Sequence, residues 1–545
     1  MVQAQLTLWK STLKEEPIYC INGQPIQDPH DPRRGPTAEI TKTLSDVATK
    51  NCLVYGFDFG YTADAILELK PEANVIIYEP SPTICNISSD YRKDLLKHPR
   101  VTIIKEVTEL DYVLLRLYKR GDPVHVTIVA NWNVLFPEEF EVFNMRVRNT
   151  LENINISEHS KDIRYQKWCD NLIHNLPSHI NNTNIKDLFF KFGNIPAVIC
   201  AAGPSLSKNL GQLKRLQDKI IIIAVNTSYA ALVDAGIIPH FVLAIESYNV
   251  KTMFTGLPIN TTTLVSSLVA HPDLQDLDFK HKITFAQNTS FYEEWMQKNL
   301  QEPYTFDMGG SVACGAFAFG LHMGCNPIIT IGQDLAFTDG KMYSKGTKYD
   351  GLKLDLDTEK GFYTFEQKKD ILKDSNVAAN TEQESKRRIK YIKGYYGGMV
   401  PTNDHFTFFL SWFESAARLV KKQGHPLVFI NATEGGAYIE GFKHIPLKKA
   451  LKGLKHRPNH NARAIIARAK PLIGSKIIML RELKRLDTIF KDETKSIEDL
   501  RDLSPLFQAY TRKTVREENE TKLQEELQEF KDLLTWGISA VEIID

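Results

Sequence analysis

Residues 196–226, PAVICAAGPSLSKNLGQLKRLQDKIIIIAVN, decide the fold of the central part of the chain. The apolar runs at the two ends of this stretch predict buried β-strands. Between them, Gly203 permits a tight turn and Pro204 suits the first turn of a helix. Leucines then recur at helical spacing, at Leu206, Leu210, Leu213 and Leu216. A strand, a helix and a second strand in this order predict a parallel, helix-covered sheet.

The segments that follow extend the same pattern to about residue 445. Further apolar runs predict strands at HFVLAIE (240–246), TTTLVSSLVA (261–270), HKITFAQ (281–287), NPIITIGQD (326–334) and HPLVFINAT (425–433). A stretch of small residues, SVACGAFAFGLHMG (311–324), predicts a closely packed helix. Residues 345–398 are charged and lack a clear period, so we interpret them as a lid or a disordered insertion.

The first 145 residues predict a smaller α/β unit. CLVYGFDFGYTADAILEL (52–69) indicates a strand, a glycine turn and a helix, and the following strand ends at Glu79. Gly56, Gly60 and this acid are typical of the nucleotide-binding half of a Rossmann fold. However, Phe57 and Phe59 flank the place where a cofactor would approach. We therefore favour a structural or acceptor-docking role for this unit; a dinucleotide or methyl-donor site is the alternative.

The remaining segments complete the predicted organisation. We expect a Rossmann-like N-terminal domain at 1–145, a helical connector at 146–192, a central parallel α/β domain at 193–445 and a helical C-terminal domain at 446–545. The fold class is thus α/β with a helical C-terminal region.

Composition narrows the functional classes. The chain has 545 residues, 43% of them hydrophobic and 24% charged, with a formal net charge of only +1. Such totals describe a globular protein and do not suggest a nucleic-acid partner. We expect no signal peptide and no membrane span, hence a cytoplasmic location. The seven cysteines are scattered without metal-ligand spacing, so we predict reduced, mostly buried thiols and no metal or other cofactor.

Polar residues recur where the predicted strands of the central domain end, the edge at which open α/β sheets bind ligands. Two of these positions face glycine turns that could expose backbone N–H groups to an anion. The candidate ligand-binding residues are Ala202, Gly203, Ser205, Asn226, Glu246, Ser247, Gly310, Ser311, Asp334, Phe337 and Tyr343. A glycine-rich turn at 433–436 either lines this edge or only connects two elements.

Taken together and in order, these motifs resemble a known group of enzymes. The AGPSL turn, Asn226, GGSVACGAFAFG (309–320) leading into IITIGQDLAF (328–337), and the insertion before His405 resemble the nucleotide-sugar domain of bacterial sialyltransferases. With INATEGGAYIEGFKHIPLKKAL (430–451), they resemble the motility-associated factor (Maf) family of flagellin glycosyltransferases more closely. The resemblance covers about 195–450; outside it only the layout matches.

This resemblance implies transfer of a nonulosonic acid, of the pseudaminic or legionaminic type, from its CMP derivative to Ser or Thr of flagellin, with or without a flagellin chaperone. Gly203 and Ser205 would approach the phosphate or cytidine, Asn226 and Glu246 the nucleotide, and Gly310 with Ser311 the sugar. The base histidine that follows the insertion in sialyltransferases corresponds to His405, with Asp404 as the other candidate base.

One position departs from the sialyltransferase pattern. Two tyrosines after the GxD strand hydrogen-bond the leaving phosphate in those enzymes; the second corresponds to Tyr343, whereas Phe337 occupies the first. The missing hydroxyl would transfer that role to Lys341 or Lys345.

Two other functions share part of the pattern. Archaeal hydroxymethylpterin diphosphokinases also carry the AGPSL turn, but they need Mg²⁺ and therefore paired carboxylates near the nucleotide. Here Glu246 is followed by serine, and Asp334 has no acidic neighbour. A non-catalytic module that binds a nucleotide-sugar and docks flagellin is the third reading.

Overall fold

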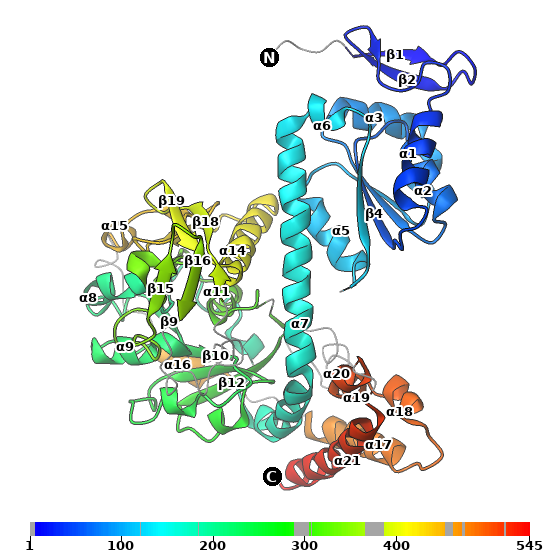
Figure 1. The fold of residues 1–545 in the computed structure, drawn as a ribbon. Helices are drawn as coiled ribbons and strands as arrows, with labels where there is room; N and C mark the ends of the chain where they lie inside the picture. Colours follow the sequence, from blue (N-terminus) through cyan, green and yellow to red (C-terminus); the bar gives the residue numbers. More distant parts are fainter. Residues whose placement is uncertain are drawn as a thin grey trace. The chain divides into compact units, whose positions relative to one another are not determined.

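The structure is a computed structural model that describes residues 6–544 except 120, 184, 288–304, 307, 366–385, 453–460, 471–474 and 517–518. The chain divides into two compact units, Met1–Lys161 and Asp162–Asp545. A long helix, α7 (Pro137–Asn181), contains the boundary between them and most of the connector predicted at 146–192 (Figure 1). Each unit is α/β, as the sequence predicts.

The first unit is built on a parallel four-stranded sheet, in the order β6-β5-β4-β7 within the described residues. Its strands are β4 (Asn51–Tyr55), β5 (Asn74–Tyr78), β6 (Val101–Ile104) and β7 (Val124–Ile128). Its larger helices are α1 (Arg34–Leu44), α2 (Tyr61–Leu69), α3 (Pro82–Tyr91) and α5 (Glu109–Leu117). An antiparallel sheet of β1 (Leu6–Lys10), β2 (Pro17–Ile21) and β3 (Gln24–Pro25) precedes them. The order of the four parallel strands is that of a Rossmann half.

Side chains fill the place above the first glycine turn of this sheet. Gly56 has a φ of 107°, and a Cβ added there would meet the Trp132 ring at 2.7 Å. The Glu79 carboxylate accepts hydrogen bonds from Trp132 Nε1 at 2.7 Å and from the Phe57 and Ser81 N–H groups at 2.8 Å. The acid that would hold a ribose in a dinucleotide site is therefore used inside the protein, which supports a structural role for this unit.

The second unit contains a parallel sheet of nine strands among the described residues, in the order β13-β12-β11-β10-β9-β8-β14-β20-β21. The strands are β8 (Ala197–Cys200), β9 (Ile221–Val225), β10 (Phe241–Ala244), β11 (Thr263–Ser267), β12 (His281–Gln287), β13 (Thr305–Phe306), β14 (Ile328–Ile331), β20 (Phe429–Asn431) and β21 (Lys443–His444). Every strand that the apolar runs predict is present. Hydrophobic clusters bury both faces of the sheet, which is why the strands read as apolar runs.

One face of this sheet packs against two helices. The small-residue helix α11 (Val312–His322) and the aromatic helix α14 (Asp404–Lys422) share a buried cluster with the strands. A Cβ added to Gly315 would overlap the Met308 side chain, and one added to Gly320 would touch isoleucines of β8, β9 and β14. The small residues therefore let α11 approach the sheet closely.

The segment after β8 differs from the predicted helix. Residues Pro204–Lys208 form a 3-10 turn, and α8 (Leu210–Leu213) is a single helical turn. The predicted apolar positions are nevertheless correct, because Leu206 and Leu213 are fully buried and Leu216 is 9% exposed. Short turns therefore place the leucines on the sheet without one continuous helix, and the expected helix N-terminus is missing.

The predicted insertion is more ordered than its composition indicates. Its described residues form antiparallel pairs of β15 (Leu354–Asp357) with β16 (Phe362–Phe365), β16 with β17 (Arg387–Arg388), and β18 (Lys390–Lys393) with β19 (Met399–Thr402). Leu352, Tyr363 and Ile389 form a small apolar cluster with Phe337 and Met342. The segment thus packs against the loop that follows β14; residues 366–385 of the predicted lid lie outside the described part.

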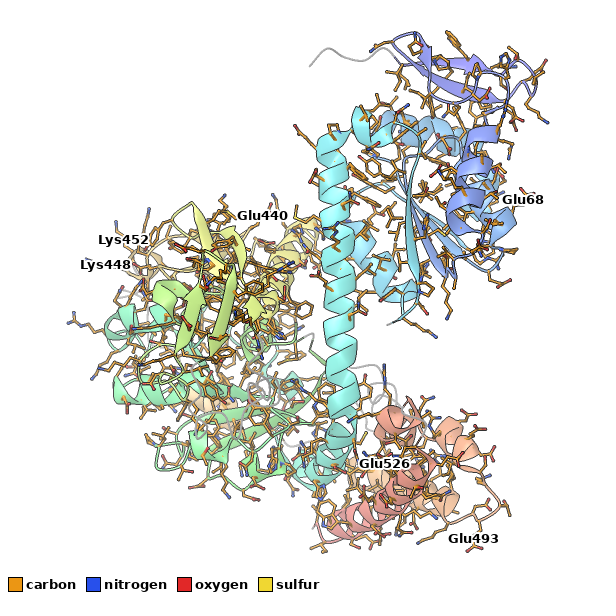
Figure 2. The ribbon with its side chains drawn as sticks, viewed as in Figure 1. Glu68, Glu440, Lys448, Lys452, Glu493 and Glu526 are labelled. Carbon is orange, nitrogen blue, oxygen red and sulfur yellow. The ribbon has the colours of Figure 1, made fainter. Side chains whose placement is uncertain are left out.

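The last hundred residues are helical, as predicted. The helices are α16 (Ala462–Ala467), α17 (Ser475–Phe490), α18 (Ile497–Leu503), α19 (Pro505–Tyr510), α20 (Arg512–Arg516) and α21 (Glu520–Glu542). The buried apolar residues of α17, α18, α19 and α21 share one cluster with the second half of α7, whereas those of α16 belong to a cluster of the central sheet. In Figure 2 the exposed Lys448, Lys452 and Glu493 side chains project outward, whereas Glu526 is 3% exposed and accepts a hydrogen bond from Thr514 Oγ1 at 2.6 Å.

Candidate functional site

The point where the strand order reverses in the central sheet lies between β8 and β14. From β8 the chain adds β9 to β13 on one side, and it then returns to place β14 on the other side. Such a switch point leaves a crevice at the carboxyl ends of the two strands, where α/β proteins bind ligands. Two predicted site residues meet there, Ser205 after β8 and Asp334 after β14.

Hydrogen bonds close this crevice. The Asp334 carboxyl accepts from Ser205 Oγ at 2.7 Å and from the Ser205 N–H at 3.2 Å. Ser205 is fully buried and Asp334 is 2% exposed. Burial raises the pKa of Asp334, and the bonds from Ser205 and Thr338 oppose that shift. In this structure both side chains thus bond to each other.

Three glycines make this close approach possible. A Cβ on Gly203 would overlap Asp334 Oδ2 and the Gly332 carbonyl oxygen, and one on Gly435 would overlap Ser205 Oγ. Gly436 has a φ of 70° and lies directly against the Asp334 backbone. The glycine-rich turn at 433–436 is consequently packed on the AGPSL turn. We call this arrangement of Gly203, Ser205, Asp334, Gly435 and Gly436 the switch-point cluster.

An open cavity lies at the carboxyl end of β9. It has a volume of about 190 Å³ and is lined in part by Asn226, Thr252, Thr347 and Lys348. Asn226 is 1% exposed and hydrogen-bonds to the Glu246 carboxyl at the end of β10. Within the described residues Asn226 Oδ1 has no hydrogen-bond partner. A buried amide oxygen without a donor is a binding group for a ligand that can supply one.

Glu246 is surrounded by phenol groups. Tyr248 is hydrogen-bonded to Tyr349, whose ring centroid is 5.2 Å from that of Tyr343, and all three interact electrostatically with one another or with Glu246. Burial is the main cause that raises the pKa values of Glu246, Tyr248 and Tyr343. The phenols therefore stay protonated at neutral pH and can donate hydrogen bonds to an anion. Tyr343, one of the candidates selected from the sequence, is in this group.

His405 lies in the first turn of α14. Asn403 caps that helix by accepting from the Phe406 N–H at 2.8 Å. The His405 side chain is exposed, yet protein groups surround it closely enough for desolvation to lower its pKa, followed by repulsion from Arg387. His405 is thus neutral at pH 7 and able to accept a proton. The other candidate base, Asp404, forms an ion pair with Lys390.

The second glycine turn lies against the same helix. Gly309 and Gly310 have φ values of 50° and 73°, and a Cβ on Gly309 would overlap the Trp412 ring. Ser311 caps α11 by accepting from the Ala313 N–H at 3.2 Å. Gly310 is exposed, and a Cβ added to it would lie 3.0 Å from the Phe408 ring of α14.

The other predicted residues have mainly structural contacts. Phe337 is 2% exposed and packs on Tyr363 at 5.0 Å between ring centroids. The Ala202 carbonyl accepts from the Ser344 N–H at 2.9 Å, and the Ser247 carbonyl from Asn171 Nδ2 at 2.9 Å. Lys341 and Lys345, the proposed substitutes for a first tyrosine, are both exposed.

Arg164 is a residue of this region that the sequence did not single out. It belongs to α7, and it interacts electrostatically with Glu246, Tyr248 and His405. Nothing in a polar helical segment distinguishes one arginine from its neighbours. Tyr248 and Tyr349 were missed as well, although Tyr248 stands only two residues after a strand end that was selected.

Two general features of the described residues bear on function. No group of three or more His, Cys, Asp or Glu side chains among them is arranged to hold a metal ion. None of the described helices is long and apolar enough to cross a membrane. The seven cysteines are buried and free of disulfides, as expected.

Comparisons with known proteins agree with this architecture. Residues 170–340 match the model of the family described as 6-hydroxymethylpterin diphosphokinase MptE-like. The solved structure of the MAf glycosyltransferase from Magnetospirillum magneticum AMB-1 aligns with 99% of this chain and 91% of its own, with a TM-score of 0.51 and 13% identity. A spermidine synthase in complex with the transition-state analogue AdoDATO aligns with 24% of this chain and 44% of its own, at 16% identity and a TM-score of 0.19. No curated protein sequence matches.

These results identify the class of fold. Over nearly its whole length the chain has the fold of a Maf glycosyltransferase, and its central region carries an MptE-like segment. The fold expected from the sequence resemblance is thereby confirmed.

Proposed function

We propose that this protein is a glycosyltransferase that moves a nonulosonic acid from its CMP derivative to Ser or Thr hydroxyls of flagellin. The observation that carries the proposal is the grouping of Asn226, Glu246 and Tyr343 beside an open cavity, with the neutral His405 linked to them through Arg164. The full-length likeness to a Maf glycosyltransferase fold supports the same class. The acceptor and the sugar follow from the sequence resemblance.

The proposed chemistry needs three kinds of group. The bond between the anomeric carbon and a phosphate oxygen breaks, and its electron pair leaves with CMP. The acceptor oxygen bonds to the anomeric carbon while its proton moves to a base, which we assign to His405. Tyr343, held protonated by burial, donates to the leaving phosphate, and Asn226 holds the nucleotide.

A diphosphokinase activity is the second candidate, because the MptE-like family model matches residues 170–340. Pyrophosphoryl transfer from ATP relies on Mg²⁺ held by carboxylates close to the phosphates. Asp334 and Glu246 at this sheet edge are each engaged by a neighbouring side chain, since Asp334 is bonded to Ser205 and Glu246 to Asn226. A module that binds the donor without turnover is the third candidate, and His405 argues for the enzyme.

The proposal is tested by incubating the protein with a CMP-activated nonulosonic acid, with and without flagellin. We expect CMP release that depends on flagellin, together with an intact-mass increase of flagellin by one sugar residue. Donor binding without either product supports the binding module. Consumption of ATP with hydroxymethylpterin in the presence of Mg²⁺ supports the diphosphokinase and contradicts the proposal.

A further inference from the structure

Two asparagines attach the second half of α7 to the central sheet at the edge that carries the site. Asn171 Nδ2 donates to the Ser247 and Val269 carbonyls at 2.9 and 3.0 Å, and Asn175 Nδ2 donates to the Leu268 and Ala270 carbonyls at 2.8 and 2.7 Å. Asn171 is 1% exposed and Asn175 fully buried. These four bonds fix which face of the helix is directed toward the ends of β10 and β11.

Arg164 shares that face. Asn171 and Asn175 follow it by seven and eleven residues, and at 3.6 residues per turn both offsets bring them within about 20° of Arg164 around the helix axis. Seven residues along the helix correspond to about 10 Å. Arg164 is therefore held two turns from the Asn171–Ser247 bond, on the side of α7 that faces Glu246 and Tyr248.

The Arg164 guanidinium has no acceptor of its own. Within the described residues it forms no hydrogen bond or ion pair, and its interactions with Glu246, Tyr248 and His405 are longer-range electrostatic ones. Burial lowers the pKa of Arg164, although the group remains charged at neutral pH. A largely desolvated guanidinium without an acceptor among the described residues is a strong receptor for an oxyanion, because its planar fork can bind two oxygens at once.

We propose that Arg164 binds the carboxylate of the acidic sugar donor, an inference that rests on the proposed function. Its position selects the sugar rather than the nucleotide. Arg164 interacts electrostatically both with Glu246 and with His405, so it lies near the nucleotide group as well as the base. Tyr343, which we assign to the phosphate, is not among the groups that interact with Arg164.

This assignment gives the connecting helix a role in specificity. A nonulosonic acid carries a carboxylate on its anomeric carbon, whereas a neutral sugar carries none. A donor with that carboxylate satisfies Arg164, and a neutral nucleotide-sugar leaves a desolvated cation without a partner. Arg164 thus selects acidic donors.

The test compares Arg164→Met with a matched control, Lys167→Met, which removes a positive charge from an exposed position on the same helix. Each protein is titrated calorimetrically with CMP, which has the phosphate only, and with the CMP-activated nonulosonic acid, which adds the carboxylate. We expect Arg164→Met to weaken binding of the sugar derivative by about 10- to 100-fold, the range for a lost charge-assisted hydrogen bond. Binding of CMP should change less than about threefold, and Lys167→Met should behave as the unmodified protein.

Other outcomes overturn the inference in distinguishable ways. Equal weakening of both ligands by Arg164→Met would assign Arg164 to the phosphate, and unchanged affinities for both would remove it from the site. Failure of the unmodified protein to bind CMP would instead contradict the proposed function. Arg164→Lys keeps the charge without the fork, and a partial recovery of the sugar derivative alone would support bidentate binding; similar melting temperatures confirm that each variant is folded.

Discussion

The hydroxyl of Ser205 and the carboxyl of Asp334 are joined by a 2.7 Å hydrogen bond across the point where the order of the central strands reverses. This bond links the turn after β8 to the turn after β14. Protein groups therefore fill the crevice in which an open α/β sheet usually binds its ligand. The open cavity lies instead at the end of β9, where Asn226 lines it.

Removal of Asp334 should therefore destabilise the central domain more than removal of Ser205. Asp334→Ala leaves the buried Ser205 N–H and O–H without an acceptor, at a cost of about 2–4 kcal/mol. Ser205→Ala removes a single hydroxyl and should cost about 1 kcal/mol. Denaturant unfolding of the two variants gives these values. Equal, small losses of unfolding free energy in both variants would mean that the switch-point cluster contributes little to stability.

Glu79 should make the stability of the first unit depend on pH. Burial raises its pKa to about 7 from 4.5, so the folded state holds the proton more tightly than the unfolded state. The contribution of Glu79 to the free energy of unfolding is complete below pH 4.5. It falls by roughly 3 kcal/mol as the pH rises to about 7 and the folded state loses the proton. Glu79→Gln removes this dependence.

The measurement is amide hydrogen exchange in β4 and β5 at pH 4.5 and 7, corrected for the intrinsic exchange rate. The difference between the unmodified protein and Glu79→Gln isolates Glu79 from the histidines, which titrate in both. The variant should gain stability relative to the parent as the pH rises. A constant difference across this range would place an ordinary pKa on Glu79.

His405→Ala should leave the fold intact and slow transfer by about a hundredfold or more, as expected for a general base. Because its pKa is lowered, the acid limb of the rate profile should have its midpoint below pH 6.5. Transfer rates from pH 5 to 8 test both points. Near-normal turnover by the variant would exclude His405, and loss of activity in Asp404→Asn would then favour the neighbouring carboxylate.

Asn226→Ala should weaken CMP binding by about 10-fold or more, because a buried side chain that can hydrogen-bond the nucleotide is lost. Glu246 also loses its partner in this variant, so the melting temperature must be followed in parallel. Thr255→Val, at another position of the cavity wall, is the control for altered lining. Unchanged affinity in Asn226→Ala would remove this residue from the nucleotide site.

The strand framework could be predicted from the sequence because its physical cause is local. Strands buried on both faces are apolar throughout, so runs such as 219–225 stand out without knowledge of their neighbours. The prediction of one helix after β8 was wrong because it too relied on local spacing. Leucine spacing alone does not distinguish a helix from two short turns that bury the same residues. The antiparallel strands of the insertion were missed because charged residues obscured their period of two.

Site residues were predictable only where they follow a strand directly. Asn226 and Glu246 satisfy that condition, whereas a loop separates Tyr343 from the end of β14; in the structure Asn226 and Tyr343 both interact with Glu246. The partnership of Ser205 and Asp334 depends on the sheet order, because 129 residues separate them. To select Arg164 one must know which face of α7 packs on the sheet, and only the tertiary hydrogen bonds of that helix show it. These two relationships required the folded molecule.

The central claim is that the cavity beside Asn226 binds a CMP-activated donor without a metal. The most direct test is isothermal titration of the protein with CMP in the presence of a chelator, repeated with ATP and Mg²⁺. The account predicts saturable binding of CMP without metal and no response to ATP. Binding of ATP that requires Mg²⁺, with no response to CMP, would contradict it.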